Sequence, residues 1–541
     1  MPDPDVLQGL DASAPLKRGF DKITGLLALT LGPTQGTILS QHETNPQPEV
    51  LTDAAVIARR ILALPDRAED VGAMLARNLV WRMHLRAGDG CATAAVLAQA
   101  ILDHAHRLRV AGVNAMSLRR GIDRATLAAV GALRRMARPI RNQLDLAKVT
   151  QTILSDADLS RVMVDIFAHL GPEAYVSIED YMAPFLERQF YEGGRWTGRL
   201  ASPYLVTDPA RRRAVLSDCL VVLYAGPVAE LEDLQPVLEL AAQSPSRQLA
   251  LIANEVTGMA LTTLVMNHQQ GSLKVIAAEL REKETRRKED YQDLAALTGA
   301  QVLSPEIGRP LRSIQPGEAG ASPRVEADPD ELIVVGDGAR PEVHEQMDVL
   351  RGRITSLLSK RDTRSENDEV LDELRLRVAR LGGQVAKLMI GANTQAERAV
   401  LRQKADKALH ALPIALREGY VPGGGVAYLN CIPAVLAVQA EGDEAMGVKV
   451  MAHALEAPFR RIATNAGAAA PGAVLAQMQR RGPGYGYDAV ARKIVPMAKT
   501  GIVDAAGVLR HALQTAASGS VMALTTETVV LKRDPQTSME P

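Results

Sequence analysis

The sequence predicts a mainly α-helical protein with an α/β insert in the middle of the chain. Apolar residues make up 47% of its 541 residues but aromatic residues only 3%, so Ala, Leu, Val and Ile must build the cores. Such a composition favours helix. The pattern is helical from about residue 12 to 137, mixed from about 190 to 340, and helical again from Ala396. The two chain ends are therefore expected to close into one domain around an insertion.

Apolar residues recur at helical spacing in the N-terminal region, first over Lys17–Leu31. Gly32 and Pro33 end this helix, because proline cannot continue the hydrogen-bond ladder. Residues 36–52 combine Gly, Asn and Pro with short β-prone pieces, which predicts a projecting hairpin or loop. Further helices are predicted at Asp70–Arg86, Thr93–Arg109 and Met116–Arg138.

Two continuously apolar runs, Cys219–Tyr224 and Gln248–Ala253, are typical of buried strands in a parallel sheet. Helices are predicted beside or between them at Leu231–Ala242 and Met259–His268. Further candidate strands are Lys274–Ala278, Gln301–Leu303 and Glu331–Val335. A long charged helical stretch, Pro341–Leu381, follows the insert.

Charge and cysteine content exclude several protein classes. Lys plus Arg number 62 against 63 Asp plus Glu, so bulk positive charge cannot drive nucleic-acid binding. Cys91, Cys219 and Cys431 lie far apart without zinc-ligand spacing, which favours a reducing compartment. The polar N-terminus lacks signal-peptide features and no apolar run is long enough to span a bilayer. We expect a soluble cytoplasmic protein with no membrane or nucleic-acid partner.

Three glycine sites are the strongest local signals: Thr30–Pro33, Gly88–Thr93 and Gly423–Gly425. No Walker A, dinucleotide-binding, GxSxG or HExxH motif accompanies them, which excludes the common NTPase and hydrolase solutions. Each site alone is explained by a helix cap or turn. Because all three sites coincide with helix ends, a shared phosphate-binding site explains them as well as separate caps or turns do. Asp89 stands between two glycines and is a candidate ligand for Mg²⁺, which prefers carboxylate and phosphate oxygens.

Other polar residues have simpler explanations. Asp53 and Asp504 are isolated acids beside small residues, a pattern typical of helix N-caps. Three histidines in helical contexts are expected to be packing or surface residues: His84, His410 and His453.

In their order along the chain, the motifs resemble a GroEL-type group I chaperonin. The resemblance covers nearly the whole chain and rests on Thr30–Pro33, Ala87–Gly90, Arg119–Asp123, Ser202–Tyr204, Ala296–Gly299, Ala408–Ala411, Gly423–Ala427, Glu456–Pro458, Tyr485–Ala489 and Gly501–Asp504. It implies an equatorial nucleotide-binding domain (1–136 and 411–541), an intermediate domain (137–191 and 383–410) and an α/β apical domain (192–382) that binds clients and co-chaperonin. It also implies ATP-driven encapsulation of non-native polypeptides in homo-oligomeric rings of seven subunits under a GroES-type lid.

By position, the resemblance implies an ATP and Mg²⁺ site in the equatorial domain. Asp89 would ligate Mg²⁺, Asp504 would hold the ribose, and Asp53 would lie near the γ-phosphate and the attacking water. The full set of matching positions is Thr30, Leu31, Gly32, Pro33, Thr52, Asp89, Gly90, Cys91, Ala92, Thr93, Gly424, Asp488, Ala489, Val490 and Asp504.

The chain departs from the family where hydrolysis is concerned. Lys407 stands at the position of the family's catalytic acid, and a cation cannot act as a carboxylate base. Asp406 is adjacent, but a neighbouring helical residue points about 100° away. Paired with phosphate, Lys407 would hold ATP rather than split it. The other departures are Thr52 for a lysine, Cys91 and Ala92 for threonines, and Asp488 for an asparagine. Together they disfavour hydrolysis more than binding.

The resemblance also implies a groove between two apical helices that binds clients and the lid. Most of the matching positions are apolar, and adaptable Leu and Met side chains suit varied clients. The positions are Leu200, Tyr204, Leu205, Gln235, Leu238, Leu261, Val265 and Met266. For each, the alternative is a place in the apical core.

Two functions of different class remain open. The first is an ATP-dependent chaperonin that binds non-native polypeptides and assists their folding in a ring. The second is a divergent paralogue that binds ATP without hydrolysing it and acts as a holdase or scaffold. An unrelated metabolic phosphotransferase is disfavoured, because the motifs extend through every domain.

Overall fold

The computed structural model describes residues 5–34, 36, 38–41, 49–191, 193–208, 212–359, 366–383 and 385–531. It divides into two compact units. The terminal unit consists of Met1–Pro172, Met182–Leu186 and Ile390–Pro541, and the middle unit of Glu173–Tyr181 and Glu187–Met389. Both chain ends belong to one helical unit and the α/β region to the other, which confirms the predicted fold class. The finer division into three domains stays a prediction.

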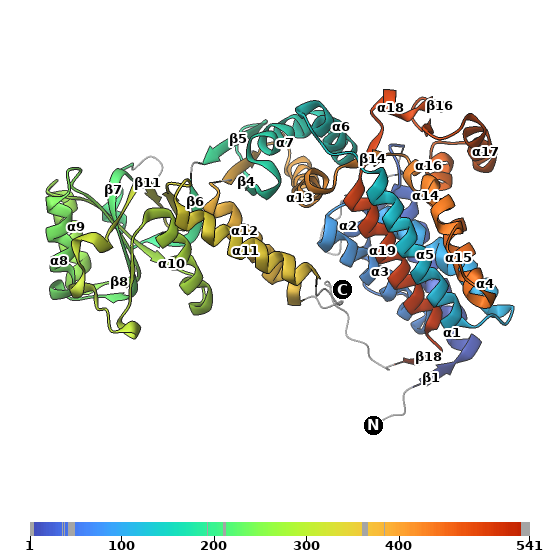
Figure 1. Cartoon of the computed structure of the whole chain (residues 1–541), viewed down its shortest axis with the longest axis horizontal. Helices are drawn as coiled ribbons and strands as arrows, with labels where there is room; N and C mark the ends of the chain where they lie inside the picture. The colour runs from blue at the N-terminus through green and yellow to red at the C-terminus, as the bar shows by residue number, and fades with distance from the viewer. Residues whose placement is uncertain are drawn as a thin grey trace. The chain divides into compact units, whose positions relative to one another are not determined.

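Long helices form the body of the terminal unit. They are α1 (Gly9–Leu27), α3 (Arg67–Ala87), α4 (Cys91–Val110), α5 (Ala115–Met136), α15 (Gly442–Ala454) and α19 (Ala506–Thr525). Figure 1 shows α19, from the C-terminal end of the chain, lying among the N-terminal helices α3, α4 and α5, with which it packs. Small side chains permit this close approach, and the Ser520 hydroxyl of α19 donates to the Ala98 carbonyl of α4 at 2.9 Å.

The chain ends also meet as strands. β1 (Asp5–Gln8) pairs antiparallel with β18 (Thr528–Leu531), with Asp5 opposite Leu531. Within the hairpin or loop predicted at residues 36–52, β2 (Ile38–Ser40) pairs antiparallel with β3 (Glu49–Leu51), and residues 42–48 of the connection between them lie outside the described residues.

The terminal unit also contains shorter helices and short strands. The helices are α2 (Ala54–Arg60), α6 (Gln143–Leu154), α7 (Ala157–Leu170), α13 (Gln395–Glu418), α14 (Val426–Leu436), α16 (Ala457–Asn465), α17 (Pro471–Arg481) and α18 (Met497–Thr500). Two short antiparallel pairs join β14 (Tyr420–Pro422) to β17 (Val503–Ala505), and β15 (Tyr485–Asp488) to β16 (Lys493–Pro496).

A seven-stranded sheet forms the centre of the middle unit, in the order β10-β7-β11-β12-β6-β9-β8, and a further pairing of β8 with β7 closes it. Its strands are β6 (Gly194–Leu200), β7 (Ala214–Val228), β8 (Gln248–Val256), β9 (Lys274–Leu280), β10 (Val302–Leu303), β11 (Gly320–Ala327) and β12 (Glu331–Val335). The predicted parallel pairing is confirmed, since β7 runs parallel to β8 with Leu220 opposite Leu249. β6 and β11 were not predicted, because their Gly, Ser, Pro and charged residues give little local β signal.

Five helices accompany this sheet: α8 (Leu231–Gln243), α9 (Gly258–Gln269), α10 (Glu284–Thr298), α11 (Pro341–Ser359) and α12 (Glu366–Leu381). The predicted charged helical stretch thus forms two helices that pack on each other. Buried ion pairs join α12 to α10, where Arg377 binds both carboxylate oxygens of Asp293 at 2.8 Å and Arg380 lies 2.8 Å from Asp290. A smaller sheet has the order β4 (Tyr175–Asp180), β13 (Val385–Ile390), β5 (Leu186–Tyr191).

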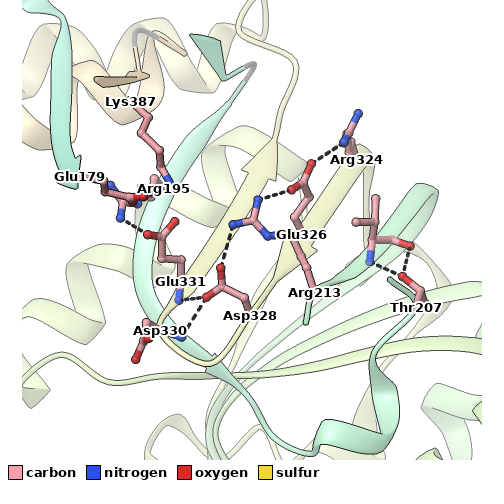
Figure 2. Close-up of polar contacts among 11 residues, drawn as sticks. Glu179, Arg195, Thr207, Arg213, Arg324, Glu326, Asp328, Asp330, Glu331 and Lys387 are labelled. Carbon is pink, nitrogen blue, oxygen red and sulfur yellow. Dashed lines mark hydrogen bonds and ion pairs between the residues drawn. The ribbon is translucent and has the colours of Figure 1, made fainter. Parts of the chain in front are cut away.

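Figure 2 shows a charged network at one end of the large sheet. Arg213 donates to Glu326 and Asp328 at 2.8 Å each, so it ties the start of β7 to the end of β11. Arg195 on β6 pairs with Glu331 on β12. The network therefore holds strand ends in register.

Candidate functional site

The Gly88–Gly90 turn between α3 and α4 is the centre of the site. Gly88 has φ +66° and caps α3, and Gly90 has φ +81° and occupies the N-cap position of α4. Gly90 has no side chain with which to cap α4, so the first amides of this helix point outward from its N-terminus. Cys91 turns its buried thiol toward the Val80 carbonyl at 3.6 Å, so only its backbone serves this surface. A helix N-terminus with free amides of this kind is suited to an anion.

Lys407 of α13 lies over this turn. Its Nζ is 2.9 Å from Asp89 Oδ1, and the same oxygen accepts the Gly90 amide at 2.6 Å. Burial alone would lower the pKa of Lys407, but the carboxylates of Asp89 and Asp53 outweigh it and raise that pKa above its usual range. The family's acid position is thus held by a charged lysine bound to the candidate metal ligand.

The backbone of α13 is packed tightly against the turn. A Cβ at Gly88 would lie 2.7 Å from the Lys407 carbonyl oxygen and 2.6 Å from the His410 Cβ. Only glycine fits here, and the contact fixes the position from which Lys407 reaches Asp89.

Asp53 is the N-cap of α2, as its sequence pattern predicted. Its Oδ1 accepts the amides of Ala55 at 2.8 Å and Val56 at 3.2 Å. It also contributes to the electrostatic field at Lys407, since its charge helps to raise the pKa of that lysine.

Asp504 is not a helix N-cap, and that prediction is wrong. It lies on β17 opposite Val421 of β14, and α19 begins two residues later with Ala505 as its N-cap. Desolvation, assisted by the charge of Asp89, raises the pKa of Asp504 to about 7. A hydrogen bond from the Gly424 backbone lowers this pKa but does not outweigh the other two effects. Asp504 and Asp89 therefore lie close enough for their charges to interact.

The remaining predicted positions come from segments distant in sequence. Leu31, Ala489 and Ala92 share one apolar cluster. The segment Thr30–Pro33 is held by Asn465, whose side-chain amide donates to the Leu31 carbonyl at 2.8 Å. The Thr30 hydroxyl is turned inward and donates to Leu27 at 2.7 Å. The structure thus brings the segments of Leu31, Ala92 and Ala489 together, and it leaves Thr52, Pro33 and Val490 exposed.

Asp488 closes its own turn, since its Oδ1 accepts the amides of Val490 at 3.0 Å and Ala491 at 2.9 Å. The interaction orders the short β15–β16 connection, which contains the predicted positions Ala489 and Val490. No structural observation assigns an adenine contact to it.

An aromatic cluster borders the site and was missed at the sequence level. The rings of His84 and His410 are 6.4 Å apart, Trp81 stacks on His84 at 5.0 Å, and the Arg59 guanidinium lies 4.7 Å over Trp81. Burial lowers the pKa of His84. The spacing of Trp81 and His84 on one helical face was the available signal.

The predicted client positions fall into three groups. Leu205 is fully buried and Leu200 nearly so, both in the core of the middle unit, so the alternative of a core position holds for these two. Leu238, Leu261 and Val265 are half-buried against the same core. The exposed members are Tyr204, Gln235 and Met266.

Two further exposed apolar side chains were missed. Leu231 at the start of α8 and Met259 at the start of α9 are 44% and 59% exposed. α8 and α9 contact each other and lie side by side in Figure 1. With Tyr204 and Met266 these residues form what is here called the α8–α9 apolar surface.

The described residues contain neither a candidate metal cluster nor a candidate membrane-spanning helix. Among these residues, no cluster of three or more His, Cys, Asp or Glu side chains has metal-site geometry. Nor is any helix in the same ranges both long and apolar enough to cross a lipid bilayer. A cavity of about 270 Å³ does exist between α5, α13 and α19, but its lining contains none of the predicted site residues.

A family model confirms the sequence resemblance at the level of the whole superfamily. The model of the TCP-1/cpn60 chaperonin family matches residues 23–184 and 229–534. The match includes both the Gly88–Gly90 turn and Lys407, and it extends through both compact units. The chain therefore belongs to the TCP-1/cpn60 chaperonin family.

Proposed function

We propose that this chaperonin binds adenine nucleotide at the Gly88–Gly90 turn and non-native polypeptide on the α8–α9 apolar surface. The observation that carries the nucleotide site is the convergence of a glycine-capped helix N-terminus, Lys407 and Asp504 in one region. The α4 amides and the ammonium group suit phosphate oxygens. Asp504 supplies a carboxyl group of the kind that accepts ribose hydroxyl hydrogens.

Exposed apolar side chains support polypeptide binding. Met259 and Met266 are 59% and 52% exposed on α9, and Tyr204 is 70% exposed. Flexible methionines adapt to varied apolar segments, which suits a surface that must accept many clients. A GroES-type lid would compete for the same residues.

We propose assembly into a group I ring of seven subunits. Strand edges that pair with no further strand in the described residues support assembly. The β1–β18 and β2–β3 pairs are each two-stranded. Their exposed apolar residues include Val6, Leu39 and Val530. Such edges favour pairing with another chain. The three cysteines are free and buried, which supports a cytoplasmic location.

The Lys407–Asp89 pair favours the second candidate function, a holdase that binds ATP without turnover. A lysine cannot polarise the attacking water as a carboxylate base does. The residues also disfavour Mg²⁺, because the Lys407 ammonium group and the Gly90 amide already occupy Asp89 Oδ1. In this reading, nucleotide stabilises one state of the protein and is not consumed.

The test is ATP hydrolysis beside ATP binding, with wild type, Lys407→Asp and Lys404→Asp. Lys404 lies one turn away on the same helix and pairs with Asp156 at 3.3 Å, so it controls for charge reversal on α13. Binding without turnover in wild type, with turnover gained only by Lys407→Asp, supports the holdase. Turnover by wild type supports the ATP-driven chaperonin, and absence of nucleotide binding contradicts both.

Protection of a client is measured separately, as light scattering from an aggregating protein with and without ATP. The α8–α9 surface predicts suppression of scattering. Suppression that is unchanged by ATP favours the holdase, and no suppression at all contradicts polypeptide binding.

A further inference from the structure

We propose that Lys407 is a built-in cation that replaces the metal ion, so that this chaperonin binds adenine nucleotide independently of Mg²⁺. The inference rests on the proposed nucleotide site. Asp89 is the acid between the two glycines, and its Oδ1 already receives two donors, Lys407 Nζ at 2.9 Å and the Gly90 amide at 2.6 Å. A metal ion would have to displace an ammonium group to use this oxygen.

Electrostatic repulsion disfavours Mg²⁺ binding at Asp89 while the Lys407 ammonium group is paired with it. Mg²⁺ binds oxygen at about 2.0–2.1 Å and requires a nearly octahedral shell. Bound to Asp89 Oδ1, it would lie within about 5 Å of the Lys407 ammonium, given the 2.9 Å ion pair. The two side chains are only 25% and 27% exposed, so water screens the repulsion incompletely.

Lysine cannot withdraw easily, because the backbone that carries it is packed against the turn. The Lys407 carbonyl and the His410 Cβ leave no space beside Gly88 even for a methyl group. The side chain could swing away, but both nearby carboxylates attract it. The second nearby carboxylate is also engaged, since Asp53 Oδ1 caps α2 by accepting two amides.

The same geometry supplies the positive charge that nucleotide phosphates need. An ammonium group has three N–H donors, and the pair with Asp89 uses one of them. The remaining donors and the uncapped amides at the start of α4 form one positive surface beside Gly90. A lysine acts toward phosphate as a point charge, which is how a metal ion neutralises it.

The test compares the affinity for ATP and ADP in excess MgCl₂ and in excess EDTA, by titration calorimetry on the full-length protein. Wild type is expected to change less than about twofold between the two conditions. Lys407→Met is expected to become metal-dependent and to lose about tenfold or more in EDTA. Lys404→Met, on the same helix, should behave as wild type.

Mn²⁺ provides a second readout that needs no turnover. Its paramagnetic resonance spectrum in the presence of ADP should show no site in wild type and one site per chain in Lys407→Met. Wild type that binds nucleotide only with Mg²⁺, or that binds Mn²⁺ itself, overturns the inference but leaves the proposed nucleotide site intact. A Lys407→Met protein that remains metal-independent overturns the assignment to Lys407. Wild type that binds no nucleotide in either condition overturns the proposed site together with the inference.

Discussion

Replacement of Arg377 by methionine is expected to destabilise the middle unit by about 3–5 kcal/mol, the range for breaking a buried ion pair. Arg377 and Asp293 are 3% and 0% exposed, and the guanidinium binds both carboxylate oxygens at 2.8 Å. Removal of the cation leaves the Asp293 charge buried, with Gln346 at 3.2 Å as its remaining side-chain donor among the described residues. The stranded charge, not the loss of attraction, causes most of the cost.

Removal of both charges should restore part of the lost stability. The double variant Arg377→Met, Asp293→Leu removes both charges and leaves an apolar pair between α10 and α12. Because no charge is then stranded, the double variant should be more stable than Arg377→Met alone.

Arg286→Met is the matched control. Arg286 on α10 pairs with Glu373 on α12 at 2.8 Å, so it joins the same two helices, but the side chains are 46% and 25% exposed. Solvent screens this pair, and its loss should cost about 0–1 kcal/mol.

The assay is urea unfolding of the full-length protein, followed by tryptophan fluorescence. Trp196 is 1% exposed in the middle unit, and Trp81 is the only other tryptophan, so a Trp81→Phe background isolates the signal. With a slope of about 1–3 kcal/mol per M urea, Arg377→Met should lower the midpoint by about 1 M or more. Equal shifts for Arg377→Met and Arg286→Met, or a double variant less stable than the single one, would refute the reasoning.

Three further predictions concern the site and the client surface. The pKa of Asp504 is raised to about 7 in the folded protein, so the folded state holds a proton that the unfolded chain releases. The free energy of unfolding should therefore fall as the pH rises from about 4 to about 7. Asp504→Asn should flatten this pH dependence, measured by thermal unfolding. Gly88→Ala should lower both stability and nucleotide affinity, because its Cβ collides with α13; Gly112→Ala has φ +93° and open space, and should show only the backbone strain of about 1–2 kcal/mol. Met266→Glu, at a 52% exposed position, should weaken client protection in light scattering without lowering the melting temperature, and unchanged protection would contradict the α8–α9 surface.

Local chemistry made parts of the fold predictable. Gly88 and Gly90 mark a helix end and a helix start because glycine adopts positive φ, and they do so here. The continuously apolar run from Cys219 to Tyr224 predicted a buried parallel strand, and β7 contains it. Asp53 caps α2 as its small neighbours indicated.

Long-range contacts decided what the sequence left open. The local pattern made Asp504 a helix cap, but pairing with Val421 places it on a strand, where it interacts with the charge of Asp89. Leu205 matches a client-binding position, yet the packing of the middle unit buries it completely.

The sequence by itself determined the helical ends, the α/β insert, the family and the unusual charge at Lys407, since composition, periodicity and glycine positions act over a few residues. Only the tertiary structure decided which group the Lys407 ammonium pairs with. Lys407 and Asp89 are separated by more than 300 residues of sequence, and the contact between α13 and the Gly88–Gly90 turn places them 2.9 Å apart. An ion pair depends on distance in space, which the order of residues along the chain does not encode locally.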